Sequence, residues 1–360
     1  MASMHPFTGV DGRHRRPSLA VSRRSVLGFA AAAGAASMLA ACGGAEGSVS
    51  TDHVLSISLN QTETHPSYIA LTKFSELLEE ATNGRWGARV YANESLGAQQ
   101  EVVQLVADGA VDMAAISSPQ MENLSLRFRP LNLPGVFTDS DHQAAVLKDE
   151  SIVGELFESL VESKSIRVLG GFTQGSRHLY TNTPVASPDD LKGKKIRVQE
   201  SDVFIALMRA MGASPTPMAY GEVYTALQAG VLDGAENNEI SYVTQRHYEV
   251  AKHFTLTNHL VGLDYIVAGE NTLTKMSVQD REAFLSCFTK AQDYFVELWN
   301  TETEKAIDTM KEAGSTIHEI DPSAFGPAID SVAEQFLSNS EDEELYTKIR
   351  EHQSAKGASK

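Results

Sequence analysis

The spacing of hydrophobic residues changes repeatedly between a period of two and the period of a helix. Leu55, Ile57 and Leu59 alternate with polar residues, which predicts a strand that begins near Val54. Residues 68–82 then place apolar side chains at helical spacing. The same alternation predicts strands at 86–92, 111–116 and 166–170, and helices at 99–107 and 142–161. Successive βα units predict a mainly parallel sheet.

A second set of elements follows, with predicted strands at 195–198, 231–235 and 265–268, and predicted helices at 202–211, 220–229 and 240–250. The chain has 360 residues, of which 42% are hydrophobic, and this length suits two α/β lobes better than one core. Residues 278–313 form an unusually long amphipathic pattern that Gly314 closes. At about 1.5 Å per residue such a helix exceeds ~45 Å. We therefore expect it to span both lobes.

The first residues of the chain differ in chemistry from the rest. Arg23 and Arg24 precede an apolar, alanine-rich run at residues 29–41, and Cys42 follows it. This pattern predicts a twin-arginine lipoprotein signal at residues 1–41, a lipid on Cys42 and a flexible tether at 42–51. A transmembrane helix is the alternative, but the run is shorter than the ~20 residues that span a bilayer. Cys287, the other cysteine, is expected to be a buried small hydrophobe.

Net charge excludes one class of partner. The full chain carries a formal charge of −17, and removal of residues 1–41 leaves 25 basic and 46 acidic side chains, an excess of 21 negative charges. A chain this acidic, with no basic face evident in its sequence, is not expected to bind nucleic acid. An anionic ligand then requires a local positive pocket, for which Arg177 and Arg197 are the candidates.

Motifs of catalysis and cofactor binding are absent from the sequence. It contains neither the glycine-rich phosphate and dinucleotide loops nor the serine-hydrolase and zinc-protease signatures, and its 11 histidines show no close metal-ligand pairing. We therefore expect no cofactor, no metal and no enzymatic activity. A secreted enzyme acting on acidic sugars is the alternative, with Glu236 and Glu239 as paired carboxylates, although nothing in their surroundings indicates perturbed acidity.

Residues 191–238 hold the groups best suited to grip an acid. Arg197 lies in a predicted strand, and Asn237 and Asn238 follow another. A guanidinium can donate two parallel hydrogen bonds to a carboxylate, and asparagine amides donate to the same oxygens without adding charge. The alternatives without a ligand-binding role are that Arg197 points outward and pairs with Glu200, and that Arg177 is a surface loop residue.

The central region closely resembles the solute-binding proteins of TRAP transporters, and the resemblance extends weakly over residues 52–340. The segments that carry it are Gly175-Ser176-Arg177, Leu191-Lys192-Gly193-Lys194-Lys195-Ile196-Arg197-Val198, Gly212-Ala213-Ser214-Pro215-Thr216-Pro217-Met218, Gly221-Glu222-Val223-Tyr224-Thr225-Ala226-Leu227-Gln228 and Asp233-Gly234-Ala235-Glu236-Asn237-Asn238. The resemblance implies a periplasmic-binding-protein-like α/β fold of the class II type. Such a fold has two mainly parallel sheets flanked by helices, hinge strands between the lobes, and a long helix spanning both. On this basis residues 51–174 with 263–302 form lobe I, and 175–262 with 303–356 form lobe II.

The same resemblance implies roles for individual residues. Arg197 matches the arginine that forms the carboxylate salt bridge in such proteins, and Arg177 and Asn237 match residues that assist it. Tyr220 matches an aromatic residue that packs on the ligand, and a core contact at a helix start is its alternative role.

The residues around the predicted site narrow the identity of the acid. Ser117 stands where the sialic-acid-binding branch has a glutamate, which argues against sialic acid. The residues around Glu200 and Asn237, together with His65-Pro66, look more like members that bind hexuronates. Groups for the sugar hydroxyls would come from His65, Ser117, Glu200, Asn237 and Asn238. His65 is equally well explained as a loop residue ahead of Pro66.

These inferences lead to one expectation and its rivals. The chain is expected to be an extracytoplasmic, lipid-anchored binding protein that takes a hexuronate such as glucuronate or galacturonate to the membrane subunits of a TRAP importer. It would act in the periplasm or at the outer face of the cytoplasmic membrane. The alternatives are another sugar acid, a C4-dicarboxylate or keto acid as ligand, or a ligand sensor of the same fold.

Overall fold

The computed structural model describes residues 51–337 and 339–352. The predicted signal, with Arg23, Arg24 and Cys42, lies outside these residues. Among the described helices, none combines the length and the apolar character needed to cross a membrane. The elements of the first lobe are β1 (His53–Ser58), α1 (Pro66–Ala81), β2 (Trp86–Tyr91), α2 (Gln99–Ala107), β3 (Met113–Ser117), α3 (Ser118–Leu124), the 3-10 helix η1 (Leu126–Asn132), α4 (Ser140–Lys148), α5 (Glu150–Glu158) and α6 (Val161–Lys164).

The first βα unit forms as the residue pattern predicts. Leu55 and Ile57 are buried on one face of β1, which pairs in parallel with β2 and β3. Helix α1 begins at Pro66, whose fixed φ suits the first turn, and His65 caps it by accepting a hydrogen bond from the Ser67 N–H. Its apolar stripe packs against the sheet and against the long helix described below.

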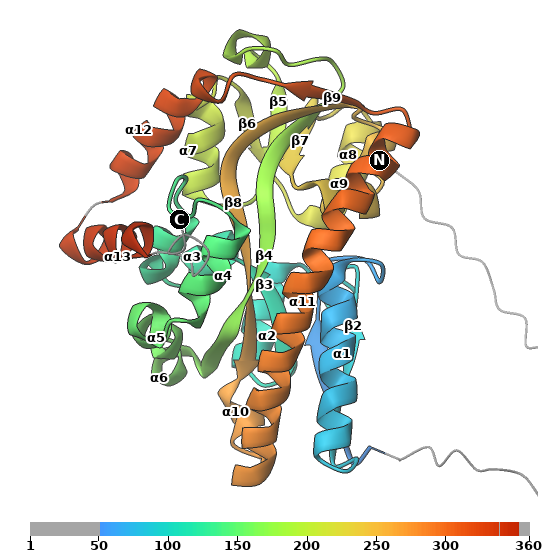
Figure 1. The fold of residues 1–360 in the computed structure, drawn as a ribbon, viewed down its shortest axis with the longest axis vertical. Coiled ribbons are helices and arrows are strands. Elements are labelled where there is room, and N and C mark those ends of the chain that lie inside the picture. Colours follow the sequence, from blue (N-terminus) through green and yellow to red (C-terminus); the bar gives the residue numbers. More distant parts are fainter. Residues whose placement is uncertain (1–50, 338, 353–360) are drawn as a thin grey trace, which may run out of the picture. The chain divides into compact units, whose positions relative to one another are not determined.

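Two long strands join the lobes. β4 (Ile166–Thr181) and β8 (His253–Gly269) pair antiparallel along their length (Figure 1). β8 also pairs with β3 in the first lobe, and β4 pairs with β7 (Gly234–Asn237) in the second. The strand order is therefore β2-β1-β3-β8-β4-β7-β5-β6, where β5 is Lys195–Val198 and β6 is Ser214–Pro217, and β9 (Thr316–Glu319) lies beside β8. The two parallel portions are not separate sheets, because these hinge strands connect them into one hydrogen-bonded sheet.

The sequence pattern located only one end of each hinge strand. Register shifts in the β4–β8 pairing fall between Val168 and Gly170, between Thr173 and Ser176, and between Arg177 and Leu179. Such irregularities break the strict alternation of side chains by which a strand is recognised. The middle of both strands is also buried on both faces, so no polar face marks it.

The second lobe repeats the βα arrangement. Besides β7 it contains the 3-10 helix η2 (Pro188–Leu191), β5 (Lys195–Val198), α7 (Asp202–Ala210), β6 (Ser214–Pro217), η3 (Tyr220–Glu222), α8 (Val223–Gln228), α9 (Glu239–Thr244), η4 (His247–Glu249) and β9 (Thr316–Glu319). β5 lies between β6 and β7 and is parallel to both. The carboxyl ends of β5 and β7 therefore lie at the same edge, as in other open α/β sheets that bind ligands there.

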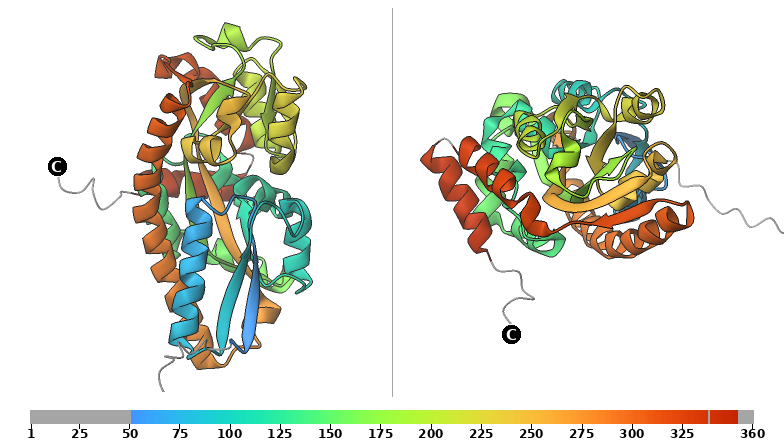
Figure 2. Two further views of the ribbon diagram at one scale, coloured as in Figure 1. Left: turned by 90° about the vertical axis from the view of Figure 1, so that its right-hand side faces the viewer. Right: turned by 90° about the horizontal axis from the view of Figure 1, so that it is seen from above.

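A single helix of 35 residues, α11 (Val278–Glu312), spans both lobes, and this prediction is confirmed. It follows the short helix α10 (Glu270–Leu273) and packs against α1 of the first lobe and α9 of the second (Figure 2). Its inward face includes Phe284, Phe288 and Phe295, and Phe295 stacks on Phe172 of hinge strand β4 with ring centroids 4.1 Å apart. Cys287 is buried and free on the same helix.

The last two helices pack on different lobes. α12 (Gly326–Phe336), which follows the 3-10 helix η5 (Pro322–Ala324), packs on α7, whereas α13 (Ser340–Glu351) packs on η1 and α5. The Tyr346 hydroxyl donates to the Pro134 carbonyl at 3.2 Å. Part of the segment expected in the second lobe thus contacts the first, while the remaining lobe boundaries stay a prediction.

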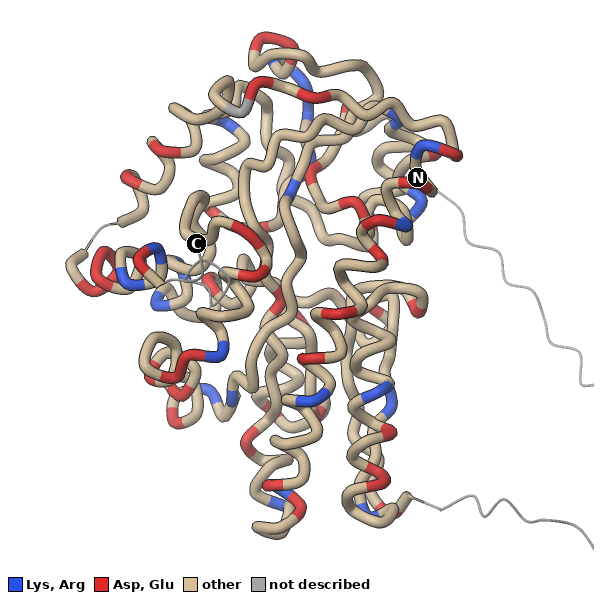
Figure 3. The backbone as a smooth tube through the Cα atoms, viewed as in Figure 1, with Lys and Arg blue, Asp and Glu red and all other residues tan. Residues whose placement is uncertain are grey.

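Two other elements differ from the pattern. The helix predicted at 142–161 is interrupted, because Asp149 ends α4 and caps α5 by accepting a hydrogen bond from the Ser151 N–H. The helix predicted at 240–250 is the short α9 followed by η4, with Arg246 in a left-handed conformation between them. Figure 3 shows acidic residues spread over the fold, with Lys and Arg scattered among them.

Candidate ligand-binding site

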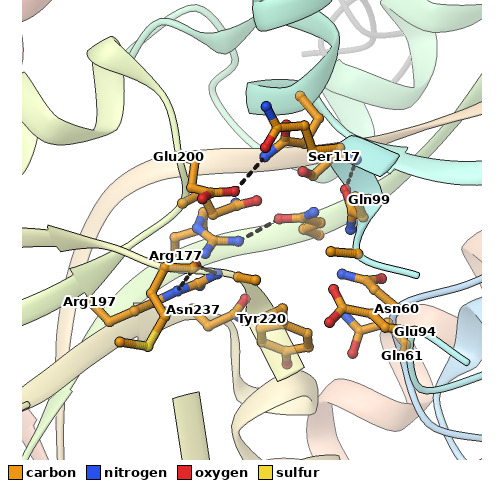
Figure 4. Close-up of a pocket in the computed structure, with 17 residues that line it drawn as sticks. Asn60, Gln61, Glu94, Gln99, Ser117, Arg177, Arg197, Glu200, Tyr220 and Asn237 are labelled. Atoms are coloured by element: carbon orange, nitrogen blue, oxygen red, sulfur yellow. Dashed lines mark hydrogen bonds between the residues drawn. The ribbon is translucent and has the colours of Figure 1, made fainter. Parts of the chain in front are cut away.

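A pocket lies where the strands of the two lobes end, and it encloses about 460 Å³ of space not filled by atoms, part of it open to solvent (Figure 4). First-lobe residues follow β1, β2 and β3, and second-lobe residues come from β5, β7 and the segment after β6. The lining residues are Asn60, Gln61, Glu94, Ala98, Gln99, Gln100, Ser117, Gln120, Gln174, Arg177, Arg197, Gln199, Glu200, Met218, Ala219, Tyr220 and Asn237.

Arg197 is a buried cation with no anionic partner. It lies on β5, is 3% exposed, and its Nε and Nη2 donate to the Met218 carbonyl at 3.0 and 2.8 Å. No carboxylate of the described residues lies within ion-pair distance, and Nη1 has no hydrogen-bond partner among them. Burial lowers the pKa of Arg197, although guanidinium groups stay protonated in proteins. The predicted alternative, an outward Arg197 paired with Glu200, is wrong.

Arg177 is equally buried, but its charge is matched within the protein. On β4, its Nε and Nη2 contact the Glu236 carboxylate at 2.5 and 2.9 Å, and Nη2 also donates to the Glu236 carbonyl at 3.1 Å. Nη1 donates to Gln174 Oε1. Burial acts to lower the pKa of Arg177, and Glu236 outweighs it, so the pKa is raised. A surface loop position for Arg177 is therefore wrong, and one Nη1 hydrogen remains for the pocket.

The two asparagines after β7 have different positions. Asn237 lines the pocket, and its Oδ1 accepts hydrogen bonds from the backbone N–H and the Nδ2 of Asn238 at 2.9 and 3.1 Å. Its own Nδ2 has no hydrogen-bond partner among the residues that the structure describes. Asn238 does not line the pocket, because its Oδ1 caps α9 by accepting from the Ser241 N–H at 2.8 Å. Asn238 thus orients Asn237.

Tyr220 lines the pocket and also belongs to the core of the second lobe. Its ring lines the pocket, and the Arg197 guanidinium lies over it, 5.5 Å from the ring centroid. The ring also belongs to the core of the second lobe, at the start of η3. Burial raises the pKa of the Tyr220 hydroxyl to about 12, so it stays protonated at neutral pH.

His65 does not line the pocket. Its Nδ1 caps α1, and its ring meets Trp299 of α11 edge-on with centroids 5.9 Å apart. Burial lowers the pKa of His65 to about 3, so the ring is neutral. The structure therefore favours the loop and capping role over a ligand contact for this residue.

Ser117 and Glu200, two of the proposed ligand contacts, both line the pocket, Ser117 at the end of β3 and Glu200 just beyond β5. The Ser117 N–H donates to Gln99 Oε1 at 2.8 Å. Glu200 is held from the first lobe by Gln120, whose Nε2 lies 3.4 Å from Glu200 Oε2, and by Asn123, whose Nδ2 donates to the Glu200 carbonyl at 2.6 Å.

Sequence reasoning missed every first-lobe residue of the pocket except Ser117, and three of these residues show why. Asn60 and Gln61 directly follow β1, and Glu94 lies in the loop after β2. Their position in the sequence could have identified them, because polar residues just beyond the carboxyl end of a parallel strand lie at the ligand-binding edge of the sheet. Glu94 Oε2 accepts a hydrogen bond from the Gly221 N–H of the second lobe at 3.0 Å.

Comparison with known proteins gives the chain a family. Residues 57–339 match the family described as bacterial extracellular solute-binding protein, family 7 (DctP). A C4-dicarboxylate-binding periplasmic protein of Rhodobacter capsulatus is 36% identical over 69% of this chain and 74% of its own length.

Two solved structures are similar over 83% of this chain and the whole of theirs. One is a TRAP periplasmic solute-binding protein of Chromohalobacter salexigens with bound D-glucuronate, at 33% identity and a TM-score of 0.79. The other is from Xanthobacter autotrophicus with bound β-D-galacturonate, at 29% identity and a TM-score of 0.79. With its two lobes, hinge strands, spanning helix and arginine-bearing pocket, this chain belongs to the DctP family of TRAP solute-binding proteins.

Proposed function

We propose that this protein binds a hexuronate, glucuronate or galacturonate, outside the cytoplasm and delivers it to the membrane subunits of a TRAP importer. The observation that carries the proposal is the Arg197 guanidinium, which is buried in an interlobe pocket and has no anionic partner in the described part of the chain. A buried charge is costly unless it is paired, so the site favours a ligand that supplies the missing anion.

The energetics of such a contact are sufficient for specific capture. Charge-assisted hydrogen bonds contribute about 1.5–3 kcal/mol each. Arg197 Nη1, the remaining hydrogen on Arg177 Nη1 and the Asn237 amide are available to one carboxylate. Together they supply a large share of the ~8 kcal/mol that corresponds to micromolar affinity.

The rest of the pocket favours a sugar over a simple aliphatic acid. Eight of its lining residues are carboxamides, from Asn60 to Asn237, and carboxamides both donate to and accept from hydroxyl groups. The solved relatives from C. salexigens and X. autotrophicus hold glucuronate and galacturonate, respectively. A sugar ring with several hydroxyl groups and one carboxylate would contact both the carboxamides and the arginines of this pocket.

Contacts between the lobes support capture by closure. Glu122 of α3 is buried, and its Oε2 accepts from the Ser201 hydroxyl, the cap of α7, at 2.8 Å. The same carboxylate is held by Arg129 and Asn132 of the first lobe. These contacts, with those of Glu94 and Glu200, would form as the lobes close over the ligand and break as they open.

The protein would carry out no chemical reaction. The two carboxylates considered for catalysis already have partners: Glu236 forms an ion pair with Arg177, and Glu239 Oε1 lies 3.2 Å from His178 Nε2. Twin-arginine export and a lipid on Cys42 belong to the same proposal and rest on the sequence alone.

Calorimetric titration of the purified protein tests the proposal. Galacturonate or glucuronate should bind with micromolar or tighter affinity, whereas galactose and glucose, which lack the carboxylate, should give no heat. Arg197→Ala should weaken uronate binding more than about 100-fold, since it removes the unpaired cation. Binding of neutral sugars, or an unchanged affinity in the variant, would refute the proposal.

A further inference from the structure

The charges of the pocket are distributed unevenly between its two sides. Its cations, Arg177 and Arg197, come from hinge strand β4 and from β5 of the second lobe. Among the described lining residues, the first lobe contributes no Lys, Arg or His, but it contributes Glu94 together with carboxamides and Ser117. Glu200, which first-lobe residues hold in place, adds a second carboxylate.

The Glu94 carboxylate is fixed in position. Asn93 and Glu94 both have left-handed backbone conformations, with φ of 57° and 54°, which non-glycine residues adopt at a cost. The side chain crosses to the second lobe, where Oε2 accepts from the Gly221 N–H at 3.0 Å. A Cβ at position 221 would lie only 2.7 Å from this oxygen, so a larger residue there would shift the end of the Glu94 side chain. Figure 4 places Glu94 beside Asn60 and Gln61, across the pocket from the arginines.

The neighbouring amides also present acceptors. Asn60 Oδ1 and Gln61 Oε1 are buried and have no hydrogen-bond partner among the described residues, and their side chains are 8% and 3% exposed. A hydroxyl group can donate to such an oxygen, whereas an ionised carboxylate has no hydrogen to give. A second acid group at this side would therefore leave these acceptors unpaired and meet Glu94 as a like charge.

We propose that Glu94, supported by Glu200, is a specificity determinant that restricts the pocket to polyhydroxylated monocarboxylates and rejects diacids. This inference rests on the proposed function and narrows its ligand class. The arginine side accepts one carboxylate, and the Glu94 side accepts hydroxyl groups. Like charges brought together in a partly desolvated site are strongly disfavoured, which is how specificity against a wrong partner is commonly achieved.

A matched pair of ligands isolates the second charge. Galactonate and galactarate are both open-chain C6 acids with the same hydroxyl configuration, and they differ only in whether the last carbon is a hydroxymethyl or a carboxylate group. Competition against bound galacturonate should show galactonate binding at least about 100-fold more tightly than galactarate. Succinate, a diacid without hydroxyls, should not compete.

Variants identify the residue responsible. Glu94→Gln keeps the shape and removes the charge, so the preference for galactonate over galactarate should shrink about tenfold through a gain in galactarate affinity. Glu94→Gln with Glu200→Gln should shrink it further. Glu282→Gln, which removes a charge from an exposed position on α11, is the control and should leave the preference unchanged.

The outcomes separate the two proposals. Galactarate binding to the native protein as tightly as galactonate, or an equal change for both acids in Glu94→Gln, would overturn the role of Glu94. Failure of every uronate to bind the native protein would instead refute the proposed function.

Discussion

Arg177 and Arg197 lie in one sheet with β7 between their strands, and both are almost fully buried, yet their electrostatic situations are opposite. Arg177 is 1% exposed and forms a two-point ion pair with Glu236, whereas Arg197 is 3% exposed, donates to the Met218 carbonyl, lies over the Tyr220 ring and has no ion-pair partner among the described residues. Residue type and burial alone therefore do not define a binding arginine. What distinguishes it is the absence of an internal anion, which leaves that role to a ligand.

The largest effect is expected from breaking the internal pair. Arg177→Met leaves the Glu236 carboxylate buried without its cation, and such a loss costs about 3–5 kcal/mol of folding free energy. Urea unfolding of the ligand-free variant measures it. The paired variant Arg177→Met with Glu236→Leu should recover most of this loss, because it removes both charges of the buried pair. No recovery would mean that the pair matters for more than its charge balance.

The opposite result is expected at Arg197 in the ligand-free protein. Arg197→Met removes a buried, unpaired cation, so the free energy of unfolding should be unchanged or higher than that of the native protein. Uronate binding should fall by about 3 kcal/mol or more, which calorimetry detects as a loss of more than about 100-fold. A variant that unfolds as easily as Arg177→Met would remove the distinction between the two residues.

Asp264, which Gln174 holds beside Arg177, predicts an unusual dependence of stability on pH. Burial raises the pKa of Asp264 to about 6, although Gln174 Nε2 donates to its Oδ1 at 2.5 Å. Because the folded pKa lies above the unfolded value of about 3.9, Asp264 makes stability fall as pH rises from ~4 to ~6. Asp264→Asn should therefore stabilise the protein at pH 8 by about 1–3 kcal/mol.

The measurement is the difference between the native and variant unfolding free energies at several pH values. His65, whose burial lowers its pKa to about 3, acts in the opposite direction, because the unfolded chain binds its proton below pH ~6.5. This contribution is common to both proteins and cancels in the difference. A gain at pH 8 that does not shrink toward pH 4 would assign it to packing instead of ionisation.

The sequence predicted where these two arginines lie, but not that one of them is paired. The resemblance to TRAP solute-binding proteins implied that both lie near the carboxylate of a ligand, and the structure puts both in one pocket. The pairing of Arg177 with Glu236 was not predictable, because the residues are 59 positions apart and meet only through the β4–β7 pairing. The strand at 195–198 and the long helix were predicted almost to the residue, since each has a clear hydrophobic period and clear ends.

The remaining parts of the site depend on geometry that no local pattern carries. His65 was a candidate ligand contact, but its ring caps α1 and faces Trp299. Glu94 was not considered, because its role depends on a left-handed loop that carries its carboxylate to Gly221 of the other lobe. Contacts between lobes form only in the folded protein, and the sequence positions of the partners do not indicate them.

The smallest effect is expected behind the carboxylate-binding groups, at Asn238. Asn238→Ala removes the cap of α9, which typically costs about 1 kcal/mol of stability. It also removes the Nδ2 that donates to Asn237 Oδ1 at 3.1 Å, so the Asn237 amide is less firmly oriented. We expect uronate affinity to fall only a few-fold, far less than for Arg197→Met. Asn238→Ser retains a capping oxygen without adding a buried charge, but it lacks the Nδ2 donor, so it should keep the stability and show the same loss of affinity, which calorimetry and urea unfolding measure separately. Equal affinity in both variants and the native protein would show that Asn237 is held by the backbone N–H of residue 238 alone.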